Sequence, residues 1–229
     1  MGKHYHQFEQ AYFTIEGEGV TTANGVDQPM VPGNVTWLPP GCVHETKCPG
    51  PKKLVYVNVS SPPASDLPHG AADPLEEGER LDPSKWAWQT TLGEPKTFHI
   101  EDRFPTPRGM RRGFNIHSVP DARNFHFVYI KLDPGRKFPR HWHDFEQAYL
   151  ILSGKGVTRI NGVDHPMEPG WVIWLPPGCV HETFNPKAND EQLRYVNFSS
   201  PPASSFPEGD HSLEDVGNEV ARVTGVREQ

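Results

Sequence analysis

The chain of 229 residues lacks any long hydrophobic run, and no window approaches the roughly 18 consecutive apolar residues of a membrane-spanning helix. It also lacks an apolar segment behind residues 1–4, so we expect no secretory signal. Cysteine is scarce, because three residues, an odd number, do not form a disulfide framework. Such cysteines fit reduced thiols in the cytoplasm. The sequence therefore predicts a cytoplasmic protein that has no membrane partner.

Clustered positive charge is absent as well. The formal net charge is −7 at pH 7, and the densest basic stretch is the short segment 108–112. A nucleic-acid interface requires Lys and Arg gathered on one face. We therefore expect a small molecule as the partner, and no nucleic acid.

Proline and glycine, in contrast, are abundant: 25 and 21 residues, about a fifth of the chain, against roughly 12% in average proteins. Proline costs about 3 kcal/mol inside a helix, which excludes a helical bundle. Between the turn residues lie short runs rich in aromatic and β-branched residues, such as 127–132, 148–152, 172–175 and 194–198. This pattern predicts an all-β fold of small antiparallel barrels. A single short helix is expected at 213–223, with Ser212 as its N-cap.

An internal repeat organises the chain. Residues 4–46 recur at 141–183 with a constant offset of 137, and 30 of the 43 aligned positions are identical. Such identity indicates a tandem duplication of one domain. Each copy contains an Asn-Gly pair, Asn24-Gly25 and Asn161-Gly162, that favours a type I′ hairpin.

The predicted boundaries follow from this repeat. They are an N-terminal domain at 1–65, a connector at 66–90, a C-terminal domain at 91–205 and a tail at 206–229. Only the second copy is preceded by candidate strands, around 98–100 and 125–132. The first barrel is therefore expected to be incomplete, unless the tail, the connector or another chain supplies strands.

Histidines recur at fixed spacing in both copies. The second copy carries His141, His143, Gln147 and His181, and the first carries His4, His6, Gln10 and His44. In a strand, residues i and i+2 point to one face, so a His-x-His pair presents two imidazoles together. A third histidine from another strand completes a set of neutral nitrogen donors suited to Mn, Fe, Co, Ni, Cu or Zn. The glutamine could add an amide oxygen and no charge.

These residues resemble the two motifs of the cupins. In the second copy the first motif is matched by Gly135, His141, His143, Gln147 and Gly154, and the second by Gly170, Pro176, Gly178, His181 and Asn185. The spacings agree throughout, and Gln147 stands where the family usually has Glu. The first copy matches from His4 to His44 but has Cys48 in place of the final Asn. The resemblance implies a bicupin, two jelly-roll barrels each with a metal inside, and a possible homodimer.

Gln147, in the place of the usual Glu, bears on the kind of reaction that we expect. The run from His143 to Gln147 is similar to the HxHxxEQ pattern of KdgF-like cupins, and three His with one Gln also occur in cupin hydroxynitrile lyases. These relatives imply non-oxidative lyase, isomerase or hydrolase chemistry on a sugar acid or carbonyl compound, because neutral ligands leave the metal's charge undiminished. An Fe(II) dioxygenase and a non-catalytic binding or storage protein are the alternatives.

Weaker candidates surround the metal ligands. Tyr149 and its twin Tyr12 lie two residues after the glutamine, so they share its face and could act as general acid or base. Three tryptophans could wall an aromatic pocket, with barrel packing as the alternative: Trp142, Trp171 and Trp174. Further candidates with less specific signals are Cys179, Cys42, His117 and His126.

Overall fold

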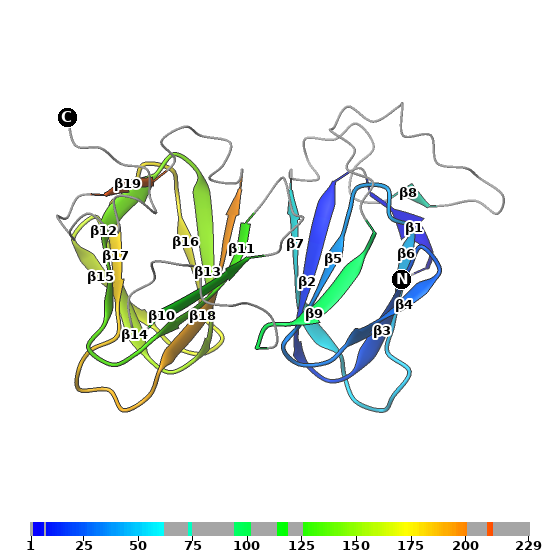
Figure 1. Ribbon diagram of the computed structural model, residues 1–229, viewed down its shortest axis with the longest axis horizontal. Coiled ribbons are helices and arrows are strands. Elements are labelled where there is room, and N and C mark those ends of the chain that lie inside the picture. The colour runs from blue at the N-terminus through cyan, green and yellow to red at the C-terminus, as the bar shows by residue number, and fades with distance from the viewer. Residues whose placement is uncertain are drawn as a thin grey trace. The chain divides into compact units, whose positions relative to one another are not determined.

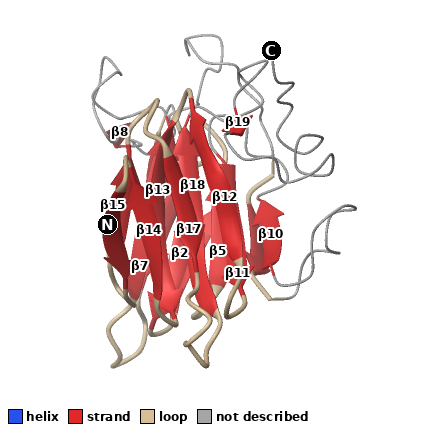
Figure 2. Cartoon of the chain, turned by 90° about the vertical axis from the view of Figure 1, so that its left-hand side faces the viewer, coloured by secondary structure: helices blue, strands red, loops and turns tan. Residues whose placement is uncertain are grey.

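The computed structural model describes residues 2–6, 8–61, 73–74, 94–101, 114–118, 126–200 and 210–212. Every regular element in these ranges is a β-strand, and no helix occurs among them (Figure 2). The all-β prediction is thus confirmed, while the helix predicted at 213–223 lies outside the described residues. No helix of the described part is long and apolar enough to span a membrane. The chain divides into two compact units, which are treated separately below.

Unit 1 comprises Met1–Arg103 and Pro120–Asn124. Its strands form two antiparallel sheets with the orders β4-β3-β6-β1-β8 and β7-β2-β5-β9. The strands are β1 (His4–Tyr5), β2 (Glu9–Glu16), β3 (Gly19–Ala23), β4 (Val26–Met30), β5 (Asn34–Leu38), β6 (His44–Lys47), β7 (Val55–Ser61), β8 (Asp73–Pro74) and β9 (Lys96–His99).

Unit 2 comprises Phe104–Val119 and Phe125–Gln229. Its sheets have the orders β15-β14-β17-β12-β19 and β10-β11-β18-β13-β16, and they face each other across the barrel interior (Figure 1). The strands are β10 (Phe114–Ser118), β11 (His126–Leu132), β12 (Lys137–His143), β13 (Glu146–Ser153), β14 (Gly156–Ile160), β15 (Val163–Met167), β16 (Val172–Leu175), β17 (His181–Phe184), β18 (Leu193–Ser200) and β19 (Asp210–Ser212).

Turn residues set the hairpins of both units. Asn24 and Gly25 have φ values of 48° and 82°, and Asn161 and Gly162 have 48° and 85°. Positive φ at both central positions is the requirement of a type I′ turn, so the two predicted hairpins, β3–β4 and β14–β15, are confirmed. Gly154 has a different reason to be glycine, because a Cβ there would collide with the carbonyl oxygen of Gln192.

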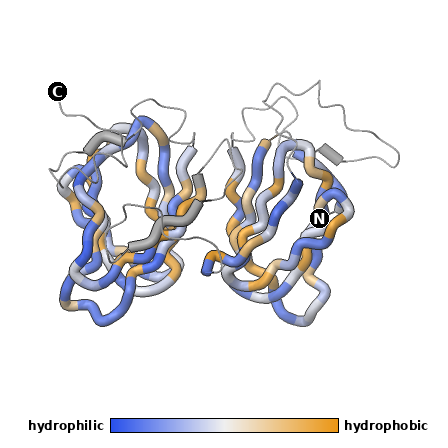
Figure 3. Tube along the Cα trace, in the orientation of Figure 1, coloured by the Kyte–Doolittle hydropathy of each residue, from blue (hydrophilic) through white to orange (hydrophobic). Residues whose placement is uncertain are grey.

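The apolar core of unit 2 lies between its two sheets. Its buried members come from strands of both sheets: Ile130, Tyr149, Met167, Ile173, Leu193 and Tyr195 are among them. Residues of differing hydropathy alternate along the strands (Figure 3), as the two-residue period of a strand with one buried face requires. These residues form the apolar interior of the barrel that carries β12 and β17.

The two units differ at the edges of one sheet. In unit 1, β9 pairs with β5, so a strand from the segment ahead of the second copy joins the sheet of the first barrel. In unit 2, the strand equivalent to β5 is β16. It pairs with β13 and has no second neighbour among the described strands. Conversely, β11 pairs with β18 in unit 2, whereas β7 of unit 1 ends its sheet within the described ranges. The same repeat is therefore flanked differently in each unit.

Candidate metal centre

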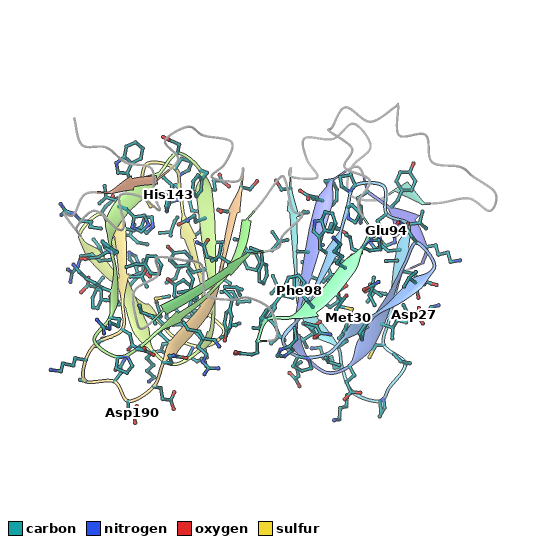
Figure 4. All side chains as sticks on the ribbon, in the orientation of Figure 1. Asp27, Met30, Glu94, Phe98, His143 and Asp190 are labelled. Atoms are coloured by element: carbon teal, nitrogen blue, oxygen red, sulfur yellow. The ribbon has the colours of Figure 1, made fainter. Side chains whose placement is uncertain are left out.

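Three imidazoles meet at one end of unit 2. His141 and His143 lie on β12, and His181, the first residue of β17, is the Cα partner of His141 in the antiparallel register. The ring centroids of His141 and His181 are 4.3 Å apart, and those of His141 and His143 are 4.7 Å apart. Their potential ligand nitrogens all lie within 4.8 Å of one another. Figure 4 labels His143 toward one end of this barrel.

Unit 1 repeats this arrangement. His4 on β1 pairs with His44 on β6, and their ring centroids are 4.3 Å apart. His6 lies 4.8 Å from His4 and 5.1 Å from His44, again between ring centroids. The structure thus brings together all six histidines that the sequence selects, three in each unit.

Backbone carbonyls orient these rings. His181 Nδ1 lies 3.0 Å from the carbonyl oxygen of Cys179, and His141 Nδ1 lies 2.6 Å from that of Pro139. His44 Nδ1 makes the same contact with the carbonyl of Cys42, at 2.8 Å. Because a carbonyl only accepts, each Nδ1 donates its proton, and Nε2 keeps a free lone pair. This is the orientation that metal-binding histidines adopt.

The environment of His181 fits a metal ion. Its side chain is 1% exposed, and its Nε2 has no hydrogen-bond partner among the described residues. Burial, reinforced by His141, lowers the pKa of His181 to about 2, so the ring stays neutral. An unsatisfied buried acceptor is costly, and neutral imidazole nitrogens are preferred ligands of divalent transition metals. The residues present therefore fit such an ion.

Glutamine and tyrosine complete the polar end of each barrel. The Tyr149 hydroxyl donates to Gln147 Oε1 at 3.3 Å, and the Tyr12 hydroxyl donates to Gln10 Oε1 at 3.1 Å. The hydroxyl of Tyr12 also lies 3.1 Å from His44 Nε2. Burial raises the pKa of Tyr12 well above its usual range, so this phenol stays protonated. Both tyrosines thus point into the barrel, beside the glutamine, as their spacing predicts.

The lowered histidine pKa values imply a pH-dependent stability. Burial lowers the pKa of His44 to about 4, whereas an imidazole in the unfolded chain protonates near about 6.5. The unfolded state then binds more protons, so the free energy of unfolding of the metal-free protein should fall as the pH drops from 7 to 4. Each such histidine contributes about 1.4 kcal/mol per pH unit below about 6.5. Urea denaturation of chelator-treated protein measures this, and a stability independent of pH would contradict it.

Two of the tryptophans do not line a pocket. Trp171 is 50% exposed and Trp174 is 58% exposed, so the predicted aromatic wall is wrong for both. The physical reason is the edge position of β16, whose outer side no described strand covers. Cys179 and Cys42 are buried. Their backbone carbonyls accept hydrogen bonds from the Nδ1 atoms of His181 and His44. The side chains of His117 and His126 lie outside the description.

Two polar residues of β18 that no sequence motif selected lie opposite the site residues of β13. Asn197 is the Cα partner of Tyr149, and Ser199 is the Cα partner of Gln147. Both belong to the duplicated run that starts at Tyr195, in which polar residues interrupt an otherwise apolar strand. The polar residues within this apolar strand were the available signal, but only the strand register shows that they lie opposite Tyr149 and Gln147.

Comparison with known proteins points to one family. The cupin domain model matches residues 1–60 and 128–197, more than half of the chain. The chain is 33% identical over 63 residues to dimethylsulfoniopropionate lyase DddW of Ruegeria pomeroyi, covering 28% of the chain and 40% of that protein. It is 35% identical over 71 residues to the oxalate-binding protein of Thermotoga maritima, covering 31% of the chain and 59% of that protein. The chain thus spans about half the length of these curated relatives.

Solved structures extend the likeness in fold to most of the chain. Salicylate 1,2-dioxygenase of Pseudaminobacter salicylatoxidans superposes with a TM-score of 0.68 at 14% identity, covering 86% of this chain and 66% of that one. A putative glyoxylate-induced protein of Pseudomonas aeruginosa superposes with a TM-score of 0.62 at 18% identity, covering 85% and 66%. At such identities the likeness shows the fold alone. Together with the two matched regions, it shows that the chain belongs to the cupin family and carries two cupin domains.

Proposed function

We propose that the chain is a metal-dependent enzyme that performs non-oxidative lyase, isomerase or hydrolase chemistry on a small oxygenated metabolite, a sugar acid or carbonyl compound. The observation that carries this proposal is the donor set of unit 2. Three imidazoles cluster there, and Tyr149, whose ring centroid lies 6.4 Å from that of His181, donates its hydroxyl proton to the amide oxygen of Gln147. Unit 1 offers the equivalent set. No carboxylate belongs to either described histidine cluster.

His141, His143, Gln147 and His181 would hold the ion in unit 2. His4, His6, Gln10 and His44 would hold it in unit 1. A divalent ion in such a neutral set supplies Lewis acidity, which polarises a bound oxygen. The carbonyls of Pro139 and Cys179 fix the ring orientations that this requires.

Tyr149 is the proposed proton donor. Its hydroxyl now donates to Gln147, and rotation about the phenol C–O bond would redirect that proton to a substrate oxygen within hydrogen-bond reach. A positioned acid of this kind contributes about 10²–10⁴-fold to a rate. Tyr12 would do the same in unit 1, where burial keeps the phenol protonated by raising its pKa.

Two alternatives have support among the relatives. The salicylate 1,2-dioxygenase structures, some of them with gentisate bound, favour an Fe(II) dioxygenase. The oxalate-binding and auxin-binding proteins among the curated relatives favour a non-catalytic binding role. The predicted domain boundaries, the cytoplasmic location and the homodimer also stay predictions.

One assay separates these functions. Protein loaded with Mn²⁺ or Fe²⁺ is incubated in D₂O without oxygen with a panel of sugar acids and 2-oxo acids, and NMR follows deuterium entering the carbon beside the carbonyl. We expect metal-dependent exchange or product formation, reduced at least about 100-fold in Tyr149→Phe with metal content unchanged. Tyr12→Phe tests unit 1 in the same way.

The contrary outcomes are distinct. Oxygen uptake with gentisate or salicylate, and no anaerobic reaction, would assign the dioxygenase function. Binding of the acids to metal-loaded protein with no turnover under either atmosphere would assign the binding role.

A further inference from the structure

Two polar side chains of β18 share the inner face of unit 2 with the metal-binding residues. Asn197 is paired with Tyr149, and Ser199 is paired with Gln147. Directly opposed residues of antiparallel strands point to the same face, with Cβ atoms about 4.5–5.5 Å apart. The alternate positions of β18, Leu193 and Tyr195, belong to the buried core, which confirms that this face is the inner one.

The amide of Asn197 carries an unsatisfied acceptor. Its Oδ1 is buried and has no hydrogen-bond partner among the described residues, and the Ser199 side chain is only 5% exposed. A buried acceptor without a partner destabilises the fold, whereas an apolar side chain at the same position does not. Folding alone therefore does not account for this acceptor, and a donor on a bound ligand would satisfy it.

The repeat provides a comparison within the same chain. Asn58 is paired with Tyr12, and Ser60 with Gln10, so unit 1 has the same residues at the same register. Asn58 is exposed, however, because β7 has no further described neighbour on its open side. In unit 2, β11 lies against β18 and places Val128 opposite Asn197. Asn197 is accordingly half-buried with an inaccessible Oδ1, whereas Asn58 is exposed.

We propose that Asn197 Oδ1 and the Ser199 hydroxyl form a substrate subsite beside the metal centre of unit 2. The subsite accepts a hydrogen bond from a hydroxyl group of the ligand, while a second oxygen of the same ligand binds at the histidines. This assigns the substrate class as small 2-hydroxy acids or hydroxy-carbonyl compounds, since one cross-strand spacing separates Ser199 from Gln147, a proposed ligand of the ion. The proposal rests on the proposed function of the metal centre.

The test compares glycolate with acetate, which lacks the hydroxyl. Both are titrated into Co²⁺-loaded protein, and the visible spectrum of the ion reports binding. The glycolate hydroxyl can also coordinate the ion, so a higher affinity of the wild type for glycolate than for acetate is not decisive. The decisive quantity is how much a variant lowers each affinity. We expect Asn197→Leu to weaken glycolate binding about five- to tenfold, the worth of one hydrogen bond, and acetate binding less than about twofold.

Controls separate the subsite from the metal and from folding. The matched variant Asn58→Leu should leave glycolate binding in unit 2 unchanged, and Ser199→Ala, which alters little volume, should weaken glycolate selectively as Asn197→Leu does. We also expect the metal-free Asn197→Leu protein to melt no lower than the wild type, because an unsatisfied acceptor is removed.

Three outcomes would overturn the subsite. They are equal weakening of glycolate and acetate, no weakening in either variant, and no binding of either acid to fully metal-loaded wild type. Failure to take up Co²⁺ at all would contradict the proposed function instead, so the two failures are distinguishable.

Discussion

Replacing His141 by alanine is expected to empty the metal site of unit 2 and leave the barrel folded. The substitution removes one of three nitrogens that lie within 4.8 Å of one another. Removing a residue that only hydrogen-bonds to a metal ligand lowers metal affinity about 10–100-fold. Removing a ligand itself should lower the affinity further. Elemental analysis of dialysed protein should show the metal per chain falling to about half of the wild-type value.

Matched variants make this result specific. His4→Ala should remove the other half, because His4 holds the equivalent position in unit 1. His165→Ala is the control, since this histidine lies exposed on β15, outside both clusters. Unchanged metal content in His141→Ala, with far-UV circular dichroism like that of the wild type, would show that the ligand assignment is wrong.

The second large effect concerns two tryptophans that occupy the same place in the repeat. Trp37 is 1% exposed, and its Nε1 donates to Glu9 Oε1 at 3.1 Å. Trp174 is 58% exposed. Trp37→Ala should therefore lower the free energy of unfolding by about 3–5 kcal/mol, whereas Trp174→Ala should change it by less than about 1 kcal/mol.

Calorimetry is the suitable measurement, because two units need not unfold in one transition. The transition that Trp37→Ala shifts is assigned to unit 1, and Trp174→Ala serves as the matched control with the same chemical change. Equal shifts in the two variants would contradict the difference in burial on which the prediction rests.

Much of the fold was predictable because its signals are local. Asn24-Gly25 and Asn161-Gly162 specify their hairpins through the backbone conformations that these residues tolerate. The His-x-His pairs were equally readable, since the two-residue period of a strand places both rings on one face. The third histidine was selected because it recurs at the same spacing in both copies, and its contact with His141 crosses between β12 and β17.

The two copies of the repeat show that the local sequence does not determine the burial of every residue. The segments around Trp37 and Trp174 are nearly the same, yet one indole is buried and the other exposed. The difference lies in a neighbour from elsewhere in the chain, since β9 pairs with β5 and no described strand pairs with the outer side of β16. No pattern within either segment carries that information.

The sequence by itself determined the duplication, the all-β class, the hairpins and the histidines of both sites, because each depends on residue type and short spacing. The tertiary structure alone decided which edges are covered, and it placed Asn197 opposite Tyr149 on the inner face. Strand partners far apart in the chain are selected by the packing of the whole barrel, and a residue's neighbours across a sheet follow from that register.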